Sequence, residues 1–428
     1  MTRLSVFPSP RHIGRGLLFA FIVLCLASPL RAEFVDTGQN ACYDTNAEIL
    51  CPEPKQSFYG QDAQYDSAAM RYLDNGDGTV TDLVTGLMWQ QTPEQMTWSE
   101  ALAAADTYTL ANYEDWRLPT IKELYSLIDF RGHVQQNETN STPFINTQYF
   151  NFSYGDTTQG ERLIDAQYWS STHYVSTTMG GGDTAFGVNF ADGRIKGYPT
   201  NKTNEVLFVR GSTGWGVNAF VDNGDGTITD TTTGLMWLQQ DSGAFEIGPE
   251  TNGAVNWEDA LAFAEGLAYA GYDDWRLPNA KELQSLVDYT RSPDTTDSAA
   301  IDPIFESTAI VNEGGQRDFG YYWTSTTHMD GPIVGIRGAY LCFGRCLGFM
   351  TNPITQEVQL LDVHGAGAQR SDPKNGNPDD YPTGFGPQGD VIRIFNYARP
   401  VRTVMTSIEK PSSDLTASML AALFILLQ

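Results

Sequence analysis

The sequence predicts two diverged copies of one compact domain, each containing short strands and helices. The stretch EDWRLPTIKELYSLIDF, which begins at Glu114, returns as DDWRLPNAKELQSLVDY at Asp273, and eleven of the seventeen positions are identical. The stretch DNGDGTVTDLVTGLMWQQ at Asp74 returns as DNGDGTITDTTTGLMWLQQ at Asp222. A chain of 428 residues with 41% hydrophobic content is long enough to bury two cores of ordinary domain size.

The two copies differ in the lengths of their loops. WSEALAAA at Trp98 returns as WEDALAFA at Trp257, and YWSST at Tyr168 returns as YWTST at Tyr322. The offset between matching stretches changes from 148 to 159 to 154 residues, as expected when insertions fall in surface loops. The predicted divisions are a leader at 33–72, a first copy at 73–211, a joining segment at 212–220, a second copy at 221–405 and a C-terminal tail at 406–428.

Each copy opens with a predicted hairpin turn. The Asn-Gly and Asp-Gly steps of DNGDGT lie between short strand-like runs, a composition typical of tight turns. A calcium loop is the alternative interpretation, because Asp74 and Asp77 are carboxylates. They do not occupy the alternate positions of an EF-hand loop, and no glutamate stands at its twelfth position. The pattern therefore favours a turn.

The first helix of each copy is predicted from its cap. Thr97 precedes Glu100 by three positions, which is an N-cap residue followed by an acid. Asn256 and Asp259 repeat this spacing in the second copy, again ahead of an alanine-rich run. Both runs are therefore expected to be helical.

The repeated segment quoted first contains the second helix. Thr120 and Glu123 form the S/T-x-x-E capping pattern, and Asn279 takes the place of the threonine in the second copy. Apolar residues then recur at helical spacing and predict a buried face: Leu124, Leu127, Ile128, Leu283, Leu286 and Val287. The residues ahead of each cap are interpreted as structural, with aromatics that pack and arginines that pair: Trp116, Arg117, Pro119, Trp275, Arg276 and Pro278.

The N-terminal 32 residues have the layout of a secretory signal peptide. A basic front precedes the apolar run LLFAFIVLCLA, and SPLRA follows, so we expect cleavage after Ala32. The four charges of this stretch are all arginines, so its removal changes the net charge from −26 to −26 − 4 = −30. Such an acidic chain is a poor partner for nucleic acid. The tail contains the apolar run ASMLAALFILL, which at eleven residues is too short to span a bilayer.

Export places the chain in an oxidising compartment, where its cysteines can pair. The mature chain keeps Cys42, Cys51, Cys342 and Cys346, and four cysteines allow three pairings. The first two lie nine positions apart in a leader that is too short to form its own core. We therefore favour a local disulfide between Cys42 and Cys51.

Each copy resembles the DUF1566 domain, also called the Lcl C-terminal domain. The resemblance rests on five motifs that occur in the same order along the chain: DGT.TD..TGLMW, W..AL..A, DWRLP..KEL.SL.D, YW.ST and a closing VR. The resemblance occurs twice, once in each copy, and the two matches together cover nearly the whole mature chain. It implies an α+β fold class of two tandem C-type lectin-like domains, each with a twisted antiparallel sheet, two helices and long ligand-facing loops. Most members are exported bacterial proteins, and the adhesin that gives the family its name binds sulfated polysaccharide. With 26 basic against 52 acidic residues, this chain is poorly suited to such a ligand.

The same resemblance extends to formylglycine-generating enzymes, which carry a copper-binding cysteine pair. Cys342 and Cys346 lie in the stretch RGAYLCFGRC with three intervening residues, where the enzymes have four, and the first copy has no cysteine there. The closing Arg399-Pro400-Val401-Arg402 lacks the cysteine that the family pattern carries, which leaves Cys342 to pair with Cys346. A cysteine-dependent oxidase is therefore one alternative function, and a structural envelope protein is another.

The stretch 364–390, HGAGAQRSDPKNGNPDDYPTGFGPQGD, has no counterpart in the first copy and is rich in Gly and Pro. It predicts a long loop rather than a strand or helix, and long loops on rigid domains are typical binding sites. The candidate ligand-binding residues in it, with a second group near the repeated YW motif, are His364, Arg370, Asp372, Asp379, Asp380, Tyr381, Asp390, Tyr322, Trp323 and His328.

The predicted function is recognition without catalysis. The sequence contains no H-E-x-x-H, G-x-S-x-G or P-loop motif. We expect an exported, adhesin-like protein, secreted, periplasmic or on the bacterial cell surface, that binds an extracellular glycan or protein through the second copy. No cofactor is expected, although the aspartates of the loop would suit calcium. Deleting the loop is expected to cost little stability.

Overall fold

The computed structural model describes residues 34–65, 67–352 and 355–404; the predicted signal peptide and the C-terminal tail lie outside them. The helices are α1 (Trp98–Ala105), α2 (Ile121–Ser126), α3 (Trp257–Glu265), α4 (Ala280–Ser285) and α5 (Pro293–Thr296). The leader contains β1 (Cys42–Tyr43) and β2 (Glu48–Ile49). The first copy contains β3 (Tyr72–Asp74), β4 (Thr79–Asp82), β5 (Met88–Gln90), β6 (Glu94–Thr97), β7 (Gln167–His173), β8 (Thr184–Asn189), β9 (Arg194–Pro199), β10 (Thr203–Val206) and β11 (Val209–Arg210).

The second copy has more strands than the first. They are β12 (Phe220–Asp222), β13 (Thr227–Asp230), β14 (Leu235–Leu238), β15 (Ala309–Val311), β16 (Arg317–Phe319), β17 (Tyr321–His328), β18 (Arg337–Cys342), β19 (Leu347–Thr351), β20 (Val358–Asp362), β21 (Gln369–Pro373) and β22 (Val401–Thr403). The fold class is therefore α+β and rich in strands, as predicted. In the described ranges, no helix is long and apolar enough to cross a membrane.

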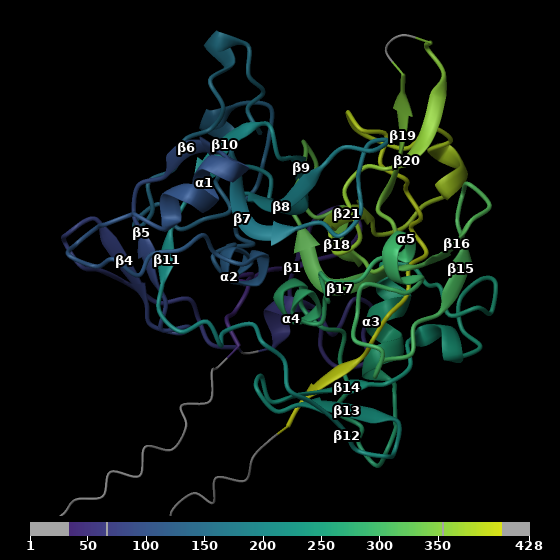
Figure 1. The fold of residues 1–428 in the computed structure, drawn as a ribbon. Coiled ribbons are helices and arrows are strands. Elements are labelled where there is room, and N and C mark those ends of the chain that lie inside the picture. The colour runs from purple at the N-terminus through teal and green to yellow at the C-terminus, as the bar shows by residue number, and fades with distance from the viewer. Residues whose placement is uncertain (1–33, 66, 353–354, 405–428) are drawn as a thin grey trace, which may run out of the picture. The chain divides into compact units, whose positions relative to one another are not determined.

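One eight-stranded sheet runs through both copies. Its order is β17-β18-β21-β9-β8-β7-β10-β6, so five strands of the first copy continue into three of the second (Figure 1). The copies meet where β9 pairs with β21 in antiparallel fashion, with Ile195 opposite Gln369. One pairing departs from the expected antiparallel sheet, because β10 runs parallel to β7.

The two residues at this junction are equivalent positions of the repeat. Val188 in β8 and Leu341 in β18 each lie opposite the tyrosine of the repeated YW motif. On its other side, Val188 pairs with Ile195, and Leu341 pairs with Gln369. Equivalent residues that face each other define a local two-fold axis, as in an isologous dimer interface. The chain is therefore built like a dimer whose two subunits are covalently joined.

The helices α2 and α4 obey the same local symmetry. Lys122 Nζ donates a hydrogen bond of 2.6 Å to the Ser285 carbonyl, and Lys281 Nζ donates one of 2.8 Å to the Ser126 carbonyl. These lysines and serines are the repeated K and S of the segment KEL.SL. Burial lowers the pKa of each lysine to about 8. The repeated segment is thus the contact between the copies as well as a helix.

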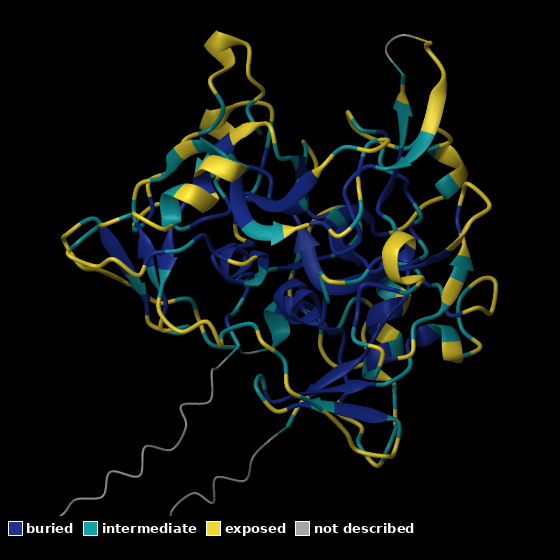
Figure 2. Ribbon diagram, viewed as in Figure 1, coloured by how far each residue is buried: buried dark blue, intermediate teal, exposed yellow. Residues whose placement is uncertain are grey.

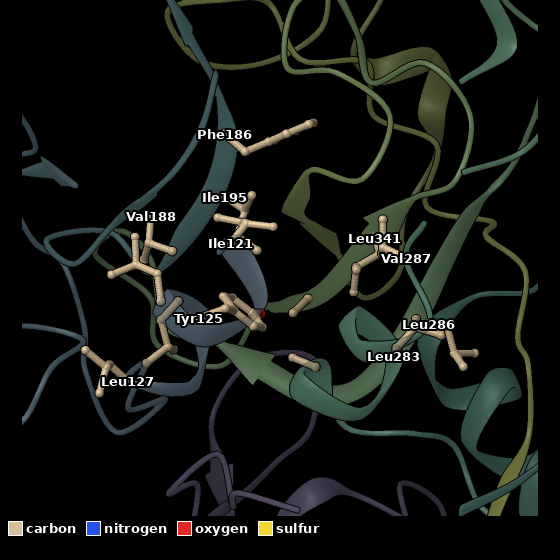
Figure 3. Close-up of a cluster of buried hydrophobic side chains, with 14 of the residues drawn as sticks. Ile121, Tyr125, Leu127, Phe186, Val188, Ile195, Leu283, Leu286, Val287 and Leu341 are labelled. Atoms are coloured by element: carbon tan, nitrogen blue, oxygen red, sulfur yellow. The ribbon is translucent and has the colours of Figure 1, made fainter. Parts of the chain in front are cut away.

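A shared hydrophobic core lies around these helices. Side chains of α2 and of the residue that follows it, Ile121, Tyr125 and Leu127, belong to one buried cluster with residues of α4 and both halves of the sheet (Figure 3). Figure 2 shows α2 and α4 buried, whereas α1 presents an exposed face. Because the core crosses the repeat boundary, burial stabilises the two copies together.

The predicted turns and helix caps are confirmed. The hairpin of β3 and β4 closes through Asp74, which accepts from the Gly76 amide, and Asp77, which accepts from the Thr79 amide. These carboxylates are thus used by their own turn. All four predicted caps accept a hydrogen bond from the backbone amide three residues on: Thr97, Thr120, Asn256 and Asn279.

The residues ahead of the second helix lie inside the protein. Trp116 and Trp275 are buried, and Pro119 and Pro278 directly precede the caps. Arg117 contacts Glu123 at 2.6 Å, and Arg276 makes the same ion pair with Glu282. The glutamate of each capping box therefore also holds the arginine that leads into the helix.

The two predicted disulfides are present, Cys42–Cys51 in the leader and Cys342–Cys346 after β18. The leader also packs on the second copy: the buried carboxyl group of Asp62 accepts hydrogen bonds from the Thr37 and Thr326 hydroxyls. Lys281 of α4 also donates a hydrogen bond to the Asp36 carbonyl, so the leader is held by its own disulfide and by contacts with α4 and β17.

The expectation of a loop without strand or helix over 364–390 is wrong. Gln369–Pro373 form β21, which pairs with β18 on one side and β9 on the other, and Pro378–Asp380 form a short 3-10 helix. The sequence Gln-Arg-Ser-Asp-Pro conceals this strand, because it lacks apolar alternation. Removing the stretch would remove the strand that joins the copies, so in place of the low cost predicted from the sequence we expect the deletion to destabilise the protein.

The true additions of the second copy flank β21. Residues 343–368, which contain the β19–β20 hairpin, connect β18 to β21, where residues 190–193 suffice between β8 and β9. Residues 374–400 then lead from β21 to β22. Part of this second connection covers the site described next.

Candidate functional site

A cavity of about 330 Å³ lies where the two copies meet. The first copy contributes residues 134–136, Ile164 and the β8–β9 turn, and the second copy contributes residues 330–332, β18, β21 and the 385–390 segment. We call it the arginine pocket, since its charged lining is Asp192, Arg194, Asp330, Arg337, Arg370 and Asp390. Neither copy alone supplies this set.

Arg194, the first residue of β9, is neutralised by carboxylates of both copies. It pairs with Asp330, and its Nη1 lies 3.3 Å from Asp192. Its Nη2 also donates to the Ser371 hydroxyl at 3.0 Å. Burial alone would lower the pKa of Arg194, but the two carboxylates raise it above its ordinary value. This guanidinium is therefore a fixed part of the wall.

Arg370 is neutralised in a similar way. Its Nε donates to Asp390 at 3.0 Å, and the other carboxylate oxygen of Asp390 lies 2.8 Å from Nε2 of the buried His364. Burial would raise the pKa of Asp390, but Arg370 and His364 lower it well below its ordinary value. Burial lowers the pKa of His364 to about 3, so the imidazole is neutral at physiological pH.

Arg337, at the start of β18, differs from the other two arginines. The residue is only 8% exposed, yet its guanidinium makes no hydrogen bond or ion pair with any residue that the structure describes. Its Cζ lies 4.5 Å from the centroid of the half-exposed Phe385 ring. Burial lowers the pKa of Arg337 even though Asp330 opposes that shift. A buried cation without a carboxylate at ion-pair distance is costly, which sets Arg337 apart from the other two arginines of the pocket.

The charged groups of the pocket are largely fixed by pairing and burial. Its three arginines balance its three aspartates, and His364 and His328 behind the wall are neutral, since burial lowers the pKa of each to about 3. Among the described residues, no group of three His, Cys, Asp or Glu side chains is arranged to hold a metal ion. A ligand here would meet one available guanidinium, an aromatic ring and polar groups such as Ser371 and Gln388.

The structure brings together some of the candidate ligand-binding residues that were predicted from the sequence. Arg370 and Asp390 line the pocket, His364 supports Asp390, and Nε2 of His328 lies 2.8 Å from the Asp192 carbonyl.

Tyr322, Trp323 and Asp372 are completely buried and do not face the pocket. Asp372 accepts hydrogen bonds from the Arg393 and Ile394 amides, and burial raises its pKa to about 6. These three residues therefore hold the fold, which corrects their place in the predicted site.

Asp379 and Asp380 lie in the exposed 3-10 helix, and Tyr381 follows it with its ring 6.4 Å from that of Phe385. None of the three lines the cavity.

Sequence reasoning missed Asp192, Arg194, Asp330, Arg337 and Phe385. Asp192 and Arg194 lie in ADGR, which looks like any hairpin turn, and Arg337 stands ahead of Cys342 in a stretch that the first copy does not repeat. No local signal places the turn of one copy against a strand of the other. Only the pairing of β9 with β21 does so.

A second cavity of about 290 Å³ lies at the contact of α2 with α4. Equivalent residues of both copies line it, including Ser126 with Ser285, and the joining segment adds Trp215 and Val217. The lysines at its wall, Lys122 and Lys281, already donate to carbonyl groups. It therefore serves as a comparison site for the experiments below.

The family model described as the Lcl C-terminal domain matches residues 78–210 and 226–345, together more than half of the chain. The two matched segments fall within the two predicted copies. No curated protein and no solved structure matches the chain. Arg194 and Arg337 lie within the matched segments, whereas Arg370, Phe385 and Asp390 lie beyond them. The chain belongs to the Lcl C-terminal domain family.

Proposed function

We propose that this chain is an exported, non-catalytic recognition protein that binds a saccharide in the arginine pocket. The observation that carries the proposal is Arg337, a buried guanidinium on an aromatic ring that has no carboxylate at ion-pair distance among the described residues, although Asp330 and Asp372 act on it from farther away. Sugar hydroxyls both donate and accept hydrogen bonds, so they match a lining that mixes Arg, Asp, Ser and Gln side chains. The apolar face of Phe385 supplies the surface on which a sugar ring can pack.

Two features support an exported, adhesin-like role. The N-terminal residues have the order of a secretory signal, and both disulfides suit an oxidising compartment. We place the protein outside the cytoplasm, in the periplasm, at the cell surface or secreted. We further infer that each copy has a C-type lectin-like fold. The support is its two capped helices against a mostly antiparallel sheet, with long connections in the second copy.

A protein ligand is the second candidate. Ile333 and Phe385 are both about half exposed, and Pro332, next to Ile333, lines the pocket. Exposed apolar side chains beside a polar pocket are typical of protein contacts.

The cysteine-dependent oxidase is less well supported. Cys342 and Cys346 are joined in a disulfide, and both are buried, with exposed fractions of 0% and 1%. A redox-active pair needs access to its substrate. A thiol count on the native and the denatured protein separates the alternatives, since an active oxidase would present reactive thiols.

A combined glycan and protein array with the mature chain tests the proposal, run with and without calcium. The strongest hits are then titrated against Phe385→Ala, which removes the ring of the pocket, and Val217→Asp, which places a charge in the second cavity. Both residues are about half exposed or more, at 49% for Phe385 and 59% for Val217, so both variants are expected to fold. We expect Phe385→Ala to weaken binding at least tenfold and Val217→Asp to leave it unchanged. Binding that is lost only in Val217→Asp would overturn the proposal, as would an array without hits.

A further inference from the structure

We propose that Arg337 binds a carboxylate, and that the arginine pocket takes a carboxylated sugar of the hexuronate class. This inference rests on the proposed saccharide-binding function and names the chemistry of the ligand. Three observations support it: the arrangement of the three arginines, the Phe385 ring that lies against Arg337, and the volume of the cavity.

The three arginines of the pocket are unequal. Arg194 has two carboxylates, Asp192 and Asp330, and Arg370 has one, Asp390. Arg337 has none at ion-pair distance in the part of the chain that the structure describes. The charges of the pocket balance as a set, but Arg337 is its one arginine without a carboxylate of the described chain at ion-pair distance, so a ligand group with a single negative charge suits it.

The shape of the Arg337 site favours a planar group. Because Phe385 lies against the guanidinium, a ligand reaches it through its N–H edge. A carboxylate meets that edge with two parallel hydrogen bonds, a geometry that also gives strong, specific pairing. The three nearby aspartates, in a chain of net charge −26, oppose a polysulfated ligand.

The remaining polar groups suit hydroxyls beside that carboxylate. The Ser371 oxygen accepts from Arg194, which leaves its proton free to be donated. Gln388 accepts from Lys196 through Oε1, and among the described residues its Nε2 donates only to the Met179 sulfur, a weak acceptor, at 3.7 Å. A cavity of about 330 Å³ is at the small end for ligand sites, and holds about one sugar residue. The shared chemistry is a carboxylate flanked by hydroxyl groups, from a free hexuronate or from one residue of a polymer.

Calorimetric titration of the mature chain tests this inference. The probes are galacturonate, glucuronate, a galacturonate trimer, the methyl ester of galacturonate, galactose and a sulfated galactose. We expect the acids to bind at least tenfold more tightly than the ester, galactose and the sulfated sugar. Tighter binding of the trimer than of the monomers identifies a polymer as the source, whereas equal binding identifies the free sugar.

Arg337→Gln should abolish the preference for acid over ester. Arg210→Gln is the matched control, because Arg210 also lies on a ring, that of Tyr113 at 3.8 Å, and pairs with Asp115 outside the pocket. Arg337→Met removes the buried charge and keeps the length of the side chain, so it should fold with an unchanged or higher melting temperature while losing the acid preference.

The outcomes distinguish the two proposals. If the ester or the sulfated sugar binds as well as the acid, and Phe385→Ala still abolishes binding, the carboxylate inference is wrong and the pocket remains the site. If Phe385→Ala leaves binding of every probe unchanged, the proposed site itself is wrong. Retention of the acid preference in both Arg337 variants would also overturn the inference.

Discussion

Among single residues, the contrast between the structural arginines and Arg337 is the most informative. Arg117 and Arg276 are repeated in sequence and paired with repeated glutamates, so their roles follow from the capping boxes. Arg337 is not part of a repeated motif, and among the described residues it has no such pair. Its importance depends on burial and on its neighbours, which a sequence does not display. Residue types therefore predicted the scaffold more readily than the site.

Asp62 provides a test at the residue scale. Burial raises the pKa of this carboxyl group to about 7, although the hydroxyls of Thr326 and Thr37 oppose the shift. A raised folded-state pKa contributes stability that is complete below the unfolded value near 4 and is lost as the pH rises through about 7. Asp62→Asn removes this contribution.

We expect the free energy of unfolding of the wild type, relative to Asp62→Asn, to fall by up to roughly 1 kcal/mol per pH unit between pH 4 and pH 7. Urea titrations of both proteins at several pH values measure the difference. The comparison with the variant is essential, because the neutral His328 and His364 shift stability in the opposite direction. A constant difference across this range would mean that Asp62 is ionised throughout.

At the scale of elements, the helices and turns were predicted because their signals are local. The caps at Thr120 and Asn279 each require only a side chain and an amide three residues away. The strand β21 could not be predicted, since its polar residues are satisfied by partners far away in sequence. Gln369, for example, accepts a hydrogen bond from the Tyr125 hydroxyl. The arginine pocket could not be predicted from the sequence for the same reason, because β21 and the β8–β9 turn both line it.

The capping threonine supports a prediction at this scale. Thr120→Ala should lower the free energy of unfolding by about 1 kcal/mol, because the Glu123 amide loses its acceptor. Asn279→Ala should have a similar effect in the second copy. Neither residue lines the arginine pocket, so binding to the array ligand should be unchanged. Loss of binding without loss of stability would assign the repeated segment to the site instead.

For the whole molecule, the central observation is that the two copies of the repeat pack on each other like the subunits of a dimer, within one chain. The β9–β21 pairing, the reciprocal Lys–Ser contacts and the shared core all cross from one copy to the other. Matching motifs revealed the duplication, but nothing in them showed that the copies share a sheet. The family resemblance likewise described one domain at a time.

This architecture predicts that the two copies unfold together. Denaturant unfolding followed by tryptophan fluorescence and by circular dichroism should give one coincident transition. Lys281→Met should shift that single transition to a lower denaturant concentration, by about 1–3 kcal/mol, because the Ser126 carbonyl is left without its donor. Two separate transitions, with Lys281→Met affecting only one, would show that the copies are independent domains.

The most direct measurement of the central claim is a crystal structure of the mature chain with the array ligand bound. We expect ligand density between the two copies, with a ligand ring against Phe385 and a carboxylate within hydrogen-bond distance of the Arg337 guanidinium. Ligand bound anywhere outside the arginine pocket, for example in the cavity beside Val217, would contradict it.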